Sequence, residues 1–130
     1  MKKVNIEQSE QTIVRANLQS YLTLTDQWKL SRREANLMIG LSGLHSIAHW
    51  AAKPDDVFLT EYQAERLSYI LSICQLLDNH CESYGDVTEW LRESNPSFVF
   101  ANKPPLEIMS GDSVSDLKRV ASWLLSVDSI

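Results

Sequence analysis

The chain has 130 residues, of which 44% are hydrophobic, and its formal net charge is −5. This length suits one globular domain, or two small helical subdomains that share a core. Polar residues follow the first three positions, and no apolar run approaches the length of a bilayer span. We therefore expect no signal peptide, no membrane segment and a cytoplasmic location.

The charge is unevenly distributed along the chain. Residues 1–60 carry seven Lys or Arg and six Asp or Glu, whereas residues 61–130 carry five and eleven. Because affinity for nucleic acid comes mostly from neutralising phosphates, we expect only the first part to face DNA.

Helical signals dominate the whole chain. Possible capping boxes, in which a cap residue and a residue three positions later bond each other's backbone, begin at Ser31, Thr60 and Asp86. We expect an all-α protein with helices at residues 6–28, 32–41, 44–53, 60–81, 86–93, 105–110 and 114–127. The helix at 60–81 should be central and join the two parts, with an apolar stripe made by Leu67, Ile70, Leu71, Cys74, Leu77 and Cys81.

Residues 31–53 have the layout of a DNA-reading helix-turn-helix. Its small residue, turn glycine and locking apolar residues would be Ala35, Gly40, Leu41, Ile47 and Trp50. The second helix offers histidines and no arginine, so DNA contact would use serines and histidines on bases and basic residues on phosphates. The predicted base contacts are Ser42, His45, Ser46 and His49, and the predicted phosphate contacts are Arg32, Arg33 and Lys53.

Nothing in the sequence specifies catalysis. His45 and His49 have the i, i+4 spacing of a metal pair but no obvious third ligand, and the four glycines are too dispersed to cradle a phosphate. Cys74 and Cys81 would lie about 10 Å apart along one helix, too far for a disulfide, which favours apolar thiols. We expect a protein that is not an enzyme and has no cofactor or metal.

Two features stand out after residue 92. The stretch RESNPSFVFANKPPLEIMSG combines helix-breaking prolines with two phenylalanines, as in an ordered loop. On the last helix, Trp123 lies about 120° from the centre of the apolar stripe made by Val114, Leu117, Val120, Ala121, Leu124 and Leu125. This tryptophan should be either half-buried or an anchor for a partner.

Taken together, these segments resemble the Xre/MbcA/ParS antitoxins over nearly the whole chain. The N-terminal likeness is QWKLSRREANLMIGLS and the helix ERLSYILSICQLL, and the more specific C-terminal likeness lies in EWLRESNPSFVFANKPPLEIM. Its matching positions are Trp90, Leu91, Asn95, Pro96, Phe98, Pro105 and Leu106, while residues 99–102 replace the glycine pair that the family usually has after its aromatic residue.

The resemblance implies a division of labour. Residues 1–60 would form an Xre-like region that binds operator DNA as a dimer, and residues 61–130 a linking helix and a module that neutralises a RES-domain toxin, an enzyme that consumes NAD. Predicted toxin contacts are Phe98, Phe100, Trp123, Val127 and Ile130. The alternatives are a stand-alone DNA-binding regulator and an orphan protein-interaction module.

Overall fold

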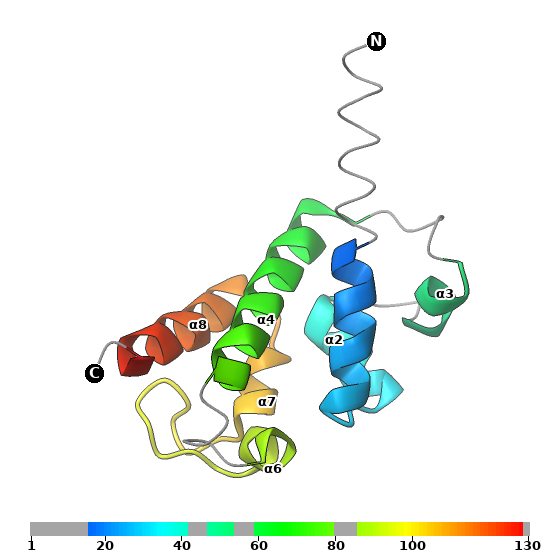
Figure 1. Cartoon of the computed structure of the whole chain (residues 1–130). Coiled ribbons are helices and arrows are strands. Elements are labelled where there is room, and N and C mark those ends of the chain that lie inside the picture. Colours follow the sequence, from blue (N-terminus) through cyan, green and yellow to red (C-terminus); the bar gives the residue numbers. More distant parts are fainter. Residues whose placement is uncertain (1–15, 42–46, 54–58, 80–85, 129–130) are drawn as a thin grey trace.

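The computed structural model describes residues 16–41, 47–53, 59–79 and 86–128. Every regular element within these ranges is a helix (Figure 1). A first helix covers residues 16–27. The others are α2 (Arg32–Ile39), α3 (Ile47–Ala52), α4 (Glu61–Asn79), α6 (Val87–Arg92), α7 (Pro105–Met109) and α8 (Val114–Asp128). The predicted all-α fold is thus confirmed for these ranges, although the predicted residues 6–15 of the first helix lie outside them.

Capping side chains begin three of these helices. The Ser31 hydroxyl accepts from the Glu34 N–H at 3.0 Å while the Glu34 carboxylate accepts from the Ser31 N–H at 2.8 Å. A second reciprocal box, at residues 60 and 63, has both bonds at 3.1 Å. The Asp86 carboxylate instead accepts from the Thr88 N–H and hydroxyl, and these bonds hold the pKa of Asp86 below its usual value. The three caps account for the sharp starts of α2, α4 and α6.

Helix α4 lies between α8 on one side and α2 on the other (Figure 1). Its most extensive packing contact is with α8. The buried apolar residues of α4 are Leu67, Ile70, Ile73 and Leu77, so the stripe is rotated toward Ile73, and Leu71 and Cys74 are only half-buried. Buried residues of both halves form one continuous core around this helix.

Helix α8 buries a narrower stripe than the sequence predicted. Leu117, Val120, Ala121 and Leu124 are buried, but Leu125 is 54% exposed. Leu125 lies at the far edge of the predicted stripe, about 80° from Leu117, so it turns away from the buried face of α8. Its inclusion in the buried face was therefore wrong.

The structure describes one of the two cysteines whose thiols were predicted to be apolar. Cys74 is a free, half-buried thiol; its burial and the charge of Asp78 raise its pKa to about 11, so it is protonated at neutral pH. Cys81 lies outside the described residues.

Of the helices described, none combines the length and the apolar character needed to cross a membrane.

Candidate functional site

The segment between α6 and α7 is an ordered loop that closes on itself. The Asn95 carboxamide oxygen accepts from the Ser97 N–H at 2.9 Å, which fixes the start of the turn. The Asn95 backbone donates to the Lys103 carbonyl at 3.2 Å and accepts from the Asn102 N–H at 3.0 Å. Phe98, within this closed loop, is 89% exposed. The loop therefore presents a large apolar ring to solvent on a hydrogen-bonded frame.

Phe100 lies in the same loop but has no exposed surface. Its ring makes edge contacts with Trp90, at 5.8 Å between centroids, and with Trp123, at 5.3 Å. The predicted toxin contact at Phe100 is thus replaced by a packing role, because a partner that docks here cannot reach a ring that is already enclosed. The structure separates two phenylalanines that the sequence treats alike.

The loop returns to α7 through two consecutive left-handed residues. Ala101 has φ of 50° and Asn102 has φ of 66°. Both residues therefore adopt a backbone conformation that glycine reaches without strain, here with ordinary side chains. Asn adopts this conformation more readily than Ala, so the cost falls mainly on Ala101.

The last helix contributes the remaining predicted contacts. Trp123 is half-buried, since one side of its ring rests against Phe100. Val127, one turn further and on the same face, is 38% exposed. We call Phe98, Trp123 and Val127 the C-terminal apolar surface. Ile130, also predicted to contact the toxin, lies outside the described residues.

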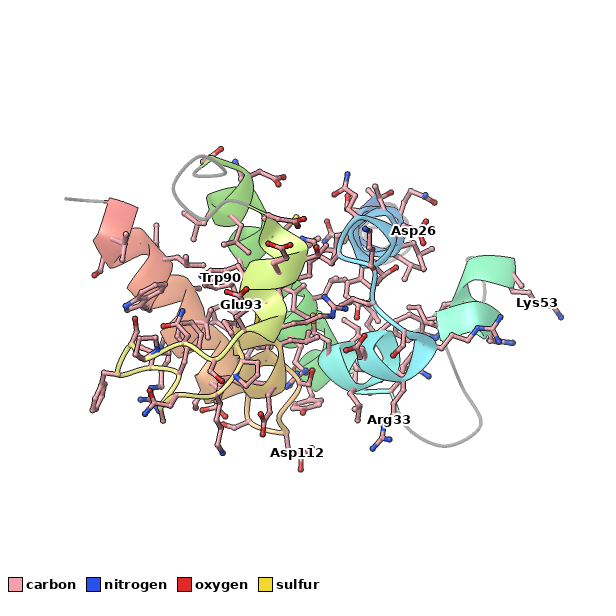
Figure 2. All side chains as sticks on the ribbon, turned by 90° about the horizontal axis from the view of Figure 1, so that it is seen from below. Asp26, Arg33, Lys53, Trp90, Glu93 and Asp112 are labelled. Carbon is pink, nitrogen blue, oxygen red and sulfur yellow. The ribbon has the colours of Figure 1, made fainter. Side chains whose placement is uncertain are left out.

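In the N-terminal part, a side chain of α2 fixes the start of α3. The Asn36 carboxamide oxygen accepts from the Ile47 N–H at 2.8 Å, and Gly40 ends α2 in the left-handed conformation with φ of 81°. The predicted DNA contacts Arg32, Arg33, His49 and Lys53 are all exposed, and Figure 2 shows Arg33 and Lys53 pointing outward from α2 and from the end of α3. Ser42, His45 and Ser46 lie outside the described residues.

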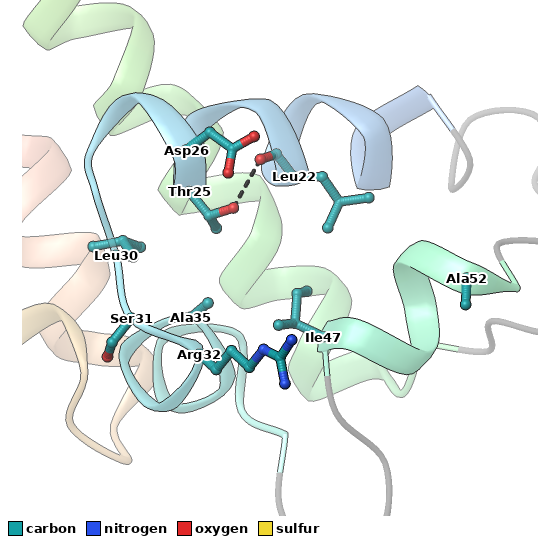
Figure 3. A pocket seen from close by; sticks show the side chains of 9 residues that line it. All are labelled: Leu22, Thr25, Asp26, Leu30, Ser31, Arg32, Ala35, Ile47 and Ala52. Carbon is teal, nitrogen blue, oxygen red and sulfur yellow. Dashed lines mark hydrogen bonds between the residues drawn. The ribbon is translucent and has the colours of Figure 1, made fainter.

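A groove of about 560 Å³ separates the first helix from α2 and α3 (Figure 3). Its wall mixes apolar and polar residues, and Arg32 extends along it toward Ile47. The lining residues are Leu22, Thr25, Asp26, Leu30, Ser31, Arg32, Ala35, Ile47 and Ala52. Arg32 therefore lies beside this groove, whereas Arg33, one position along the helix, points to solvent.

Sequence analysis did not single out Arg66, which is completely buried. Its Nε donates to the Met38 carbonyl at 2.6 Å, its Nη2 to the Met109 carbonyl at 2.7 Å and its Nη1 to the Gly111 carbonyl at 2.8 Å. A signal was available: Arg66 is in register with Ile70, Ile73 and Leu77 on the buried face of α4. An arginine at such a position predicts internal acceptors.

The described residues contain no group of three or more His, Cys, Asp or Glu side chains that could hold a metal ion. Large apolar side chains are left accessible on the loop and on α8: Phe98 is 89% exposed, Val127 is 38% exposed and Trp123 is half-buried. Apolar side chains that lie in water are of the kind that a protein partner can cover.

Comparison with known proteins shows a similarity over most of the chain. The chain is 29% identical over 116 residues to the uncharacterized protein y4oB of Sinorhizobium fredii (strain NBRC 101917 / NGR234), and the match covers 89% of this chain and 87% of that protein. No protein-family model and no solved structure matches. This chain is thus similar, over most of both lengths, to a protein whose own function is uncharacterized.

Proposed function

We propose that this protein is an antitoxin that binds and neutralises a RES-type, NAD-consuming toxin through the C-terminal apolar surface. The observation that carries the proposal is the 89% exposure of Phe98 on a loop whose backbone is hydrogen-bonded to itself. An aromatic ring held in water contributes several tenths to a few kcal/mol when a partner pocket covers it. The sequence resemblance to the Xre/MbcA/ParS antitoxins supplies the class of partner.

In this proposal Phe98 is the central contact, and Trp123 and Val127 extend it along α8. The loop enters a concave part of the toxin, and the bound helix blocks access of NAD to the active site. The antitoxin takes no part in the reaction. Inhibition follows from occupancy alone, so it should be stoichiometric and reversible.

The test replaces Phe98 with alanine and measures binding to a RES-type toxin encoded beside this protein. Because the ring is exposed, the substitution should leave the fold intact and weaken binding by about tenfold or more. Isothermal titration calorimetry measures the Kd. Cell growth and the cellular NAD level during co-expression with the toxin measure how well the variant neutralises it.

Leu37→Ala is the matched control, because Leu37 is another exposed apolar residue, at 44%, but lies on α2. It should bind like the unmodified chain. Unchanged binding by Phe98→Ala, or an equal loss with Leu37→Ala, contradicts the proposed surface. A lack of any binding or neutralisation by the unmodified chain contradicts the antitoxin function itself.

A second proposal is DNA binding by α2 and α3, either as part of an antitoxin or in a stand-alone regulator. The supporting observation is the Asn36 bond to Ile47, which fixes the angle between these helices, together with the exposed Arg33 and Lys53. A palindromic operator would require a dimer with half-sites about one helical turn apart.

The expected result is a mobility shift of the protein's own promoter that weakens steeply as salt rises. Arg33→Ala should flatten the slope of log K against log salt by about 0.9, as expected for one lost phosphate contact. Arg119→Ala, which removes an exposed arginine from α8, is the control. Absence of a shift at low salt excludes this function, and an equal effect of the two substitutions excludes the assignment of Arg33.

A further inference from the structure

Arg66 joins the carbonyl ends of helices from both halves of the chain. The Met38 carbonyl belongs to the last turn of α2, while the Met109 and Gly111 carbonyls belong to the end of α7 and the turn after it. The last carbonyls of a helix have no partner within the helix and carry the negative end of its dipole. One buried guanidinium therefore caps two helix ends that are about seventy positions apart in the sequence.

The chemistry of this joint depends on an arginine. The three carbonyls lie in different directions around the guanidinium plane and use all three of its nitrogens. The Tyr62 ring lies 5.5 Å from the Arg66 Cζ atom, and its hydroxyl accepts from Nη1 at 3.3 Å. Among the residues that the structure describes, no carboxylate pairs with Arg66. A lysine has one nitrogen and could not reach all three carbonyls together.

A second arginine repeats the arrangement at a separate place. Arg92, on α6, donates from Nη1 to the Trp28 carbonyl at 3.2 Å and from Nη2 to the Lys29 carbonyl at 2.9 Å, at the end of the first helix. It also contacts the Glu34 carboxylate at 3.3 Å. Unlike Arg66, its side chain is 37% exposed, so water can replace the bonds that it makes.

We propose that Arg66 is a latch that makes the N-terminal unit (residues 16–53) and the C-terminal unit (residues 59–128) fold and open as one cooperative body. Without the guanidinium, the carbonyl ends of α2 and α7 lose buried partners at the point where the units meet, and the N-terminal unit can detach first. Helix α4 stays with the C-terminal unit, because its longest contact is with α8. This inference is independent of the proposed function, since it concerns the chain without any partner.

The four tryptophans allow a direct test because they divide between the units. Trp28 and Trp50 report on the first unit, and Trp90 and Trp123 on the second. Incorporated 5-fluorotryptophan gives each a fluorine resonance that can be followed during urea unfolding of the full chain. For the unmodified protein we expect four coincident transitions.

Arg66→Met keeps an unbranched apolar stem like the methylene part of arginine but removes the guanidinium and its donors. The midpoints of Trp28 and Trp50 should then fall below those of Trp90 and Trp123 by about 1 M urea or more. Arg66→Lys should show the same order, and Arg119→Met, an exposed control on α8, should keep the four transitions together. A folded Arg66→Met in which all four midpoints fall equally overturns the latch, since this is the behaviour of a residue that only fills the core.

If Arg66→Met does not fold, amide hydrogen exchange of the unmodified chain decides the matter. Slowly exchanging amides of α2 and α8 should then open with equal free energies that fall with equal slopes as urea is added. An α2 that opens at a lower free energy than α8, with a shallower slope, overturns the proposal.

Discussion

Phe100→Ala should lower the free energy of unfolding by about 3–5 kcal/mol, among the largest effects of any single truncation in this chain. The ring has no exposed surface and joins the loop to α6 through Trp90 and to α8 through Trp123. Its loss would leave a cavity between two rigid indoles, which cannot collapse to fill it. Urea unfolding followed by circular dichroism measures the change.

Phe98→Ala is a control of the same chemistry only two positions away. Because Phe98 is 89% exposed, its truncation should change the unfolding free energy by less than about 0.5 kcal/mol. The pair thus separates binding from stability. Phe98→Ala should weaken only the binding of a partner, whereas Phe100→Ala should lower the free energy of unfolding whether or not a partner is present. Similar losses of stability in both variants would show that the loop does not hold the two rings as described.

The second large effect is expected at Gly40, where alanine should cost about 2–3 kcal/mol. Gly40 has φ of 81°, in the left-handed region, and a Cβ there would lie 2.7 Å from Cε2 of Tyr62 and 3.3 Å from Cδ of Arg66. Relief of this overlap would move Tyr62, whose hydroxyl donates to the Asp112 carbonyl at 2.5 Å. The melting temperature should fall by roughly 3–5 °C for each kcal/mol.

Gly111→Ala provides the comparison. A Cβ at Gly111 meets nothing closer than 3.4 Å, and this glycine does not have a left-handed φ. We expect a change below about 1 kcal/mol, measured by the same thermal unfolding. Equal destabilisation by the two substitutions would mean that neither the backbone conformation nor the Tyr62 contact makes Gly40 special.

Local chemistry made the helices predictable. The caps at Ser31 and Thr60 form as expected because both partners of a capping box lie within four residues of each other. The glycine that ends α2 was likewise identified as the turn residue. Each helix boundary that the structure describes falls within about three residues of the prediction, as is usual where sequence-local bonds decide.

Contacts between distant residues were harder to foresee. Arg66 binds three backbone carbonyls, and a carbonyl is present at every position, so no residue type marks an acceptor. The two phenylalanines could not be told apart for a related reason: Phe98 and Phe100 have the same side chain, and the path of the whole loop determines which ring faces inward. The contact surface at Phe98, Trp123 and Val127 therefore stays a prediction.

The two left-handed residues of the loop bear on how Phe98 would meet a partner. A glycine pair at these positions would leave the free loop a broad range of conformations, and binding would have to suppress them at an entropic cost. Ala101 and Asn102 have fewer accessible backbone conformations than glycine. The hydrogen bonds of the loop to the Asn95 backbone restrict these conformations further. The aromatic side chain is thus preorganised, so adjustment on association falls to the partner's pocket.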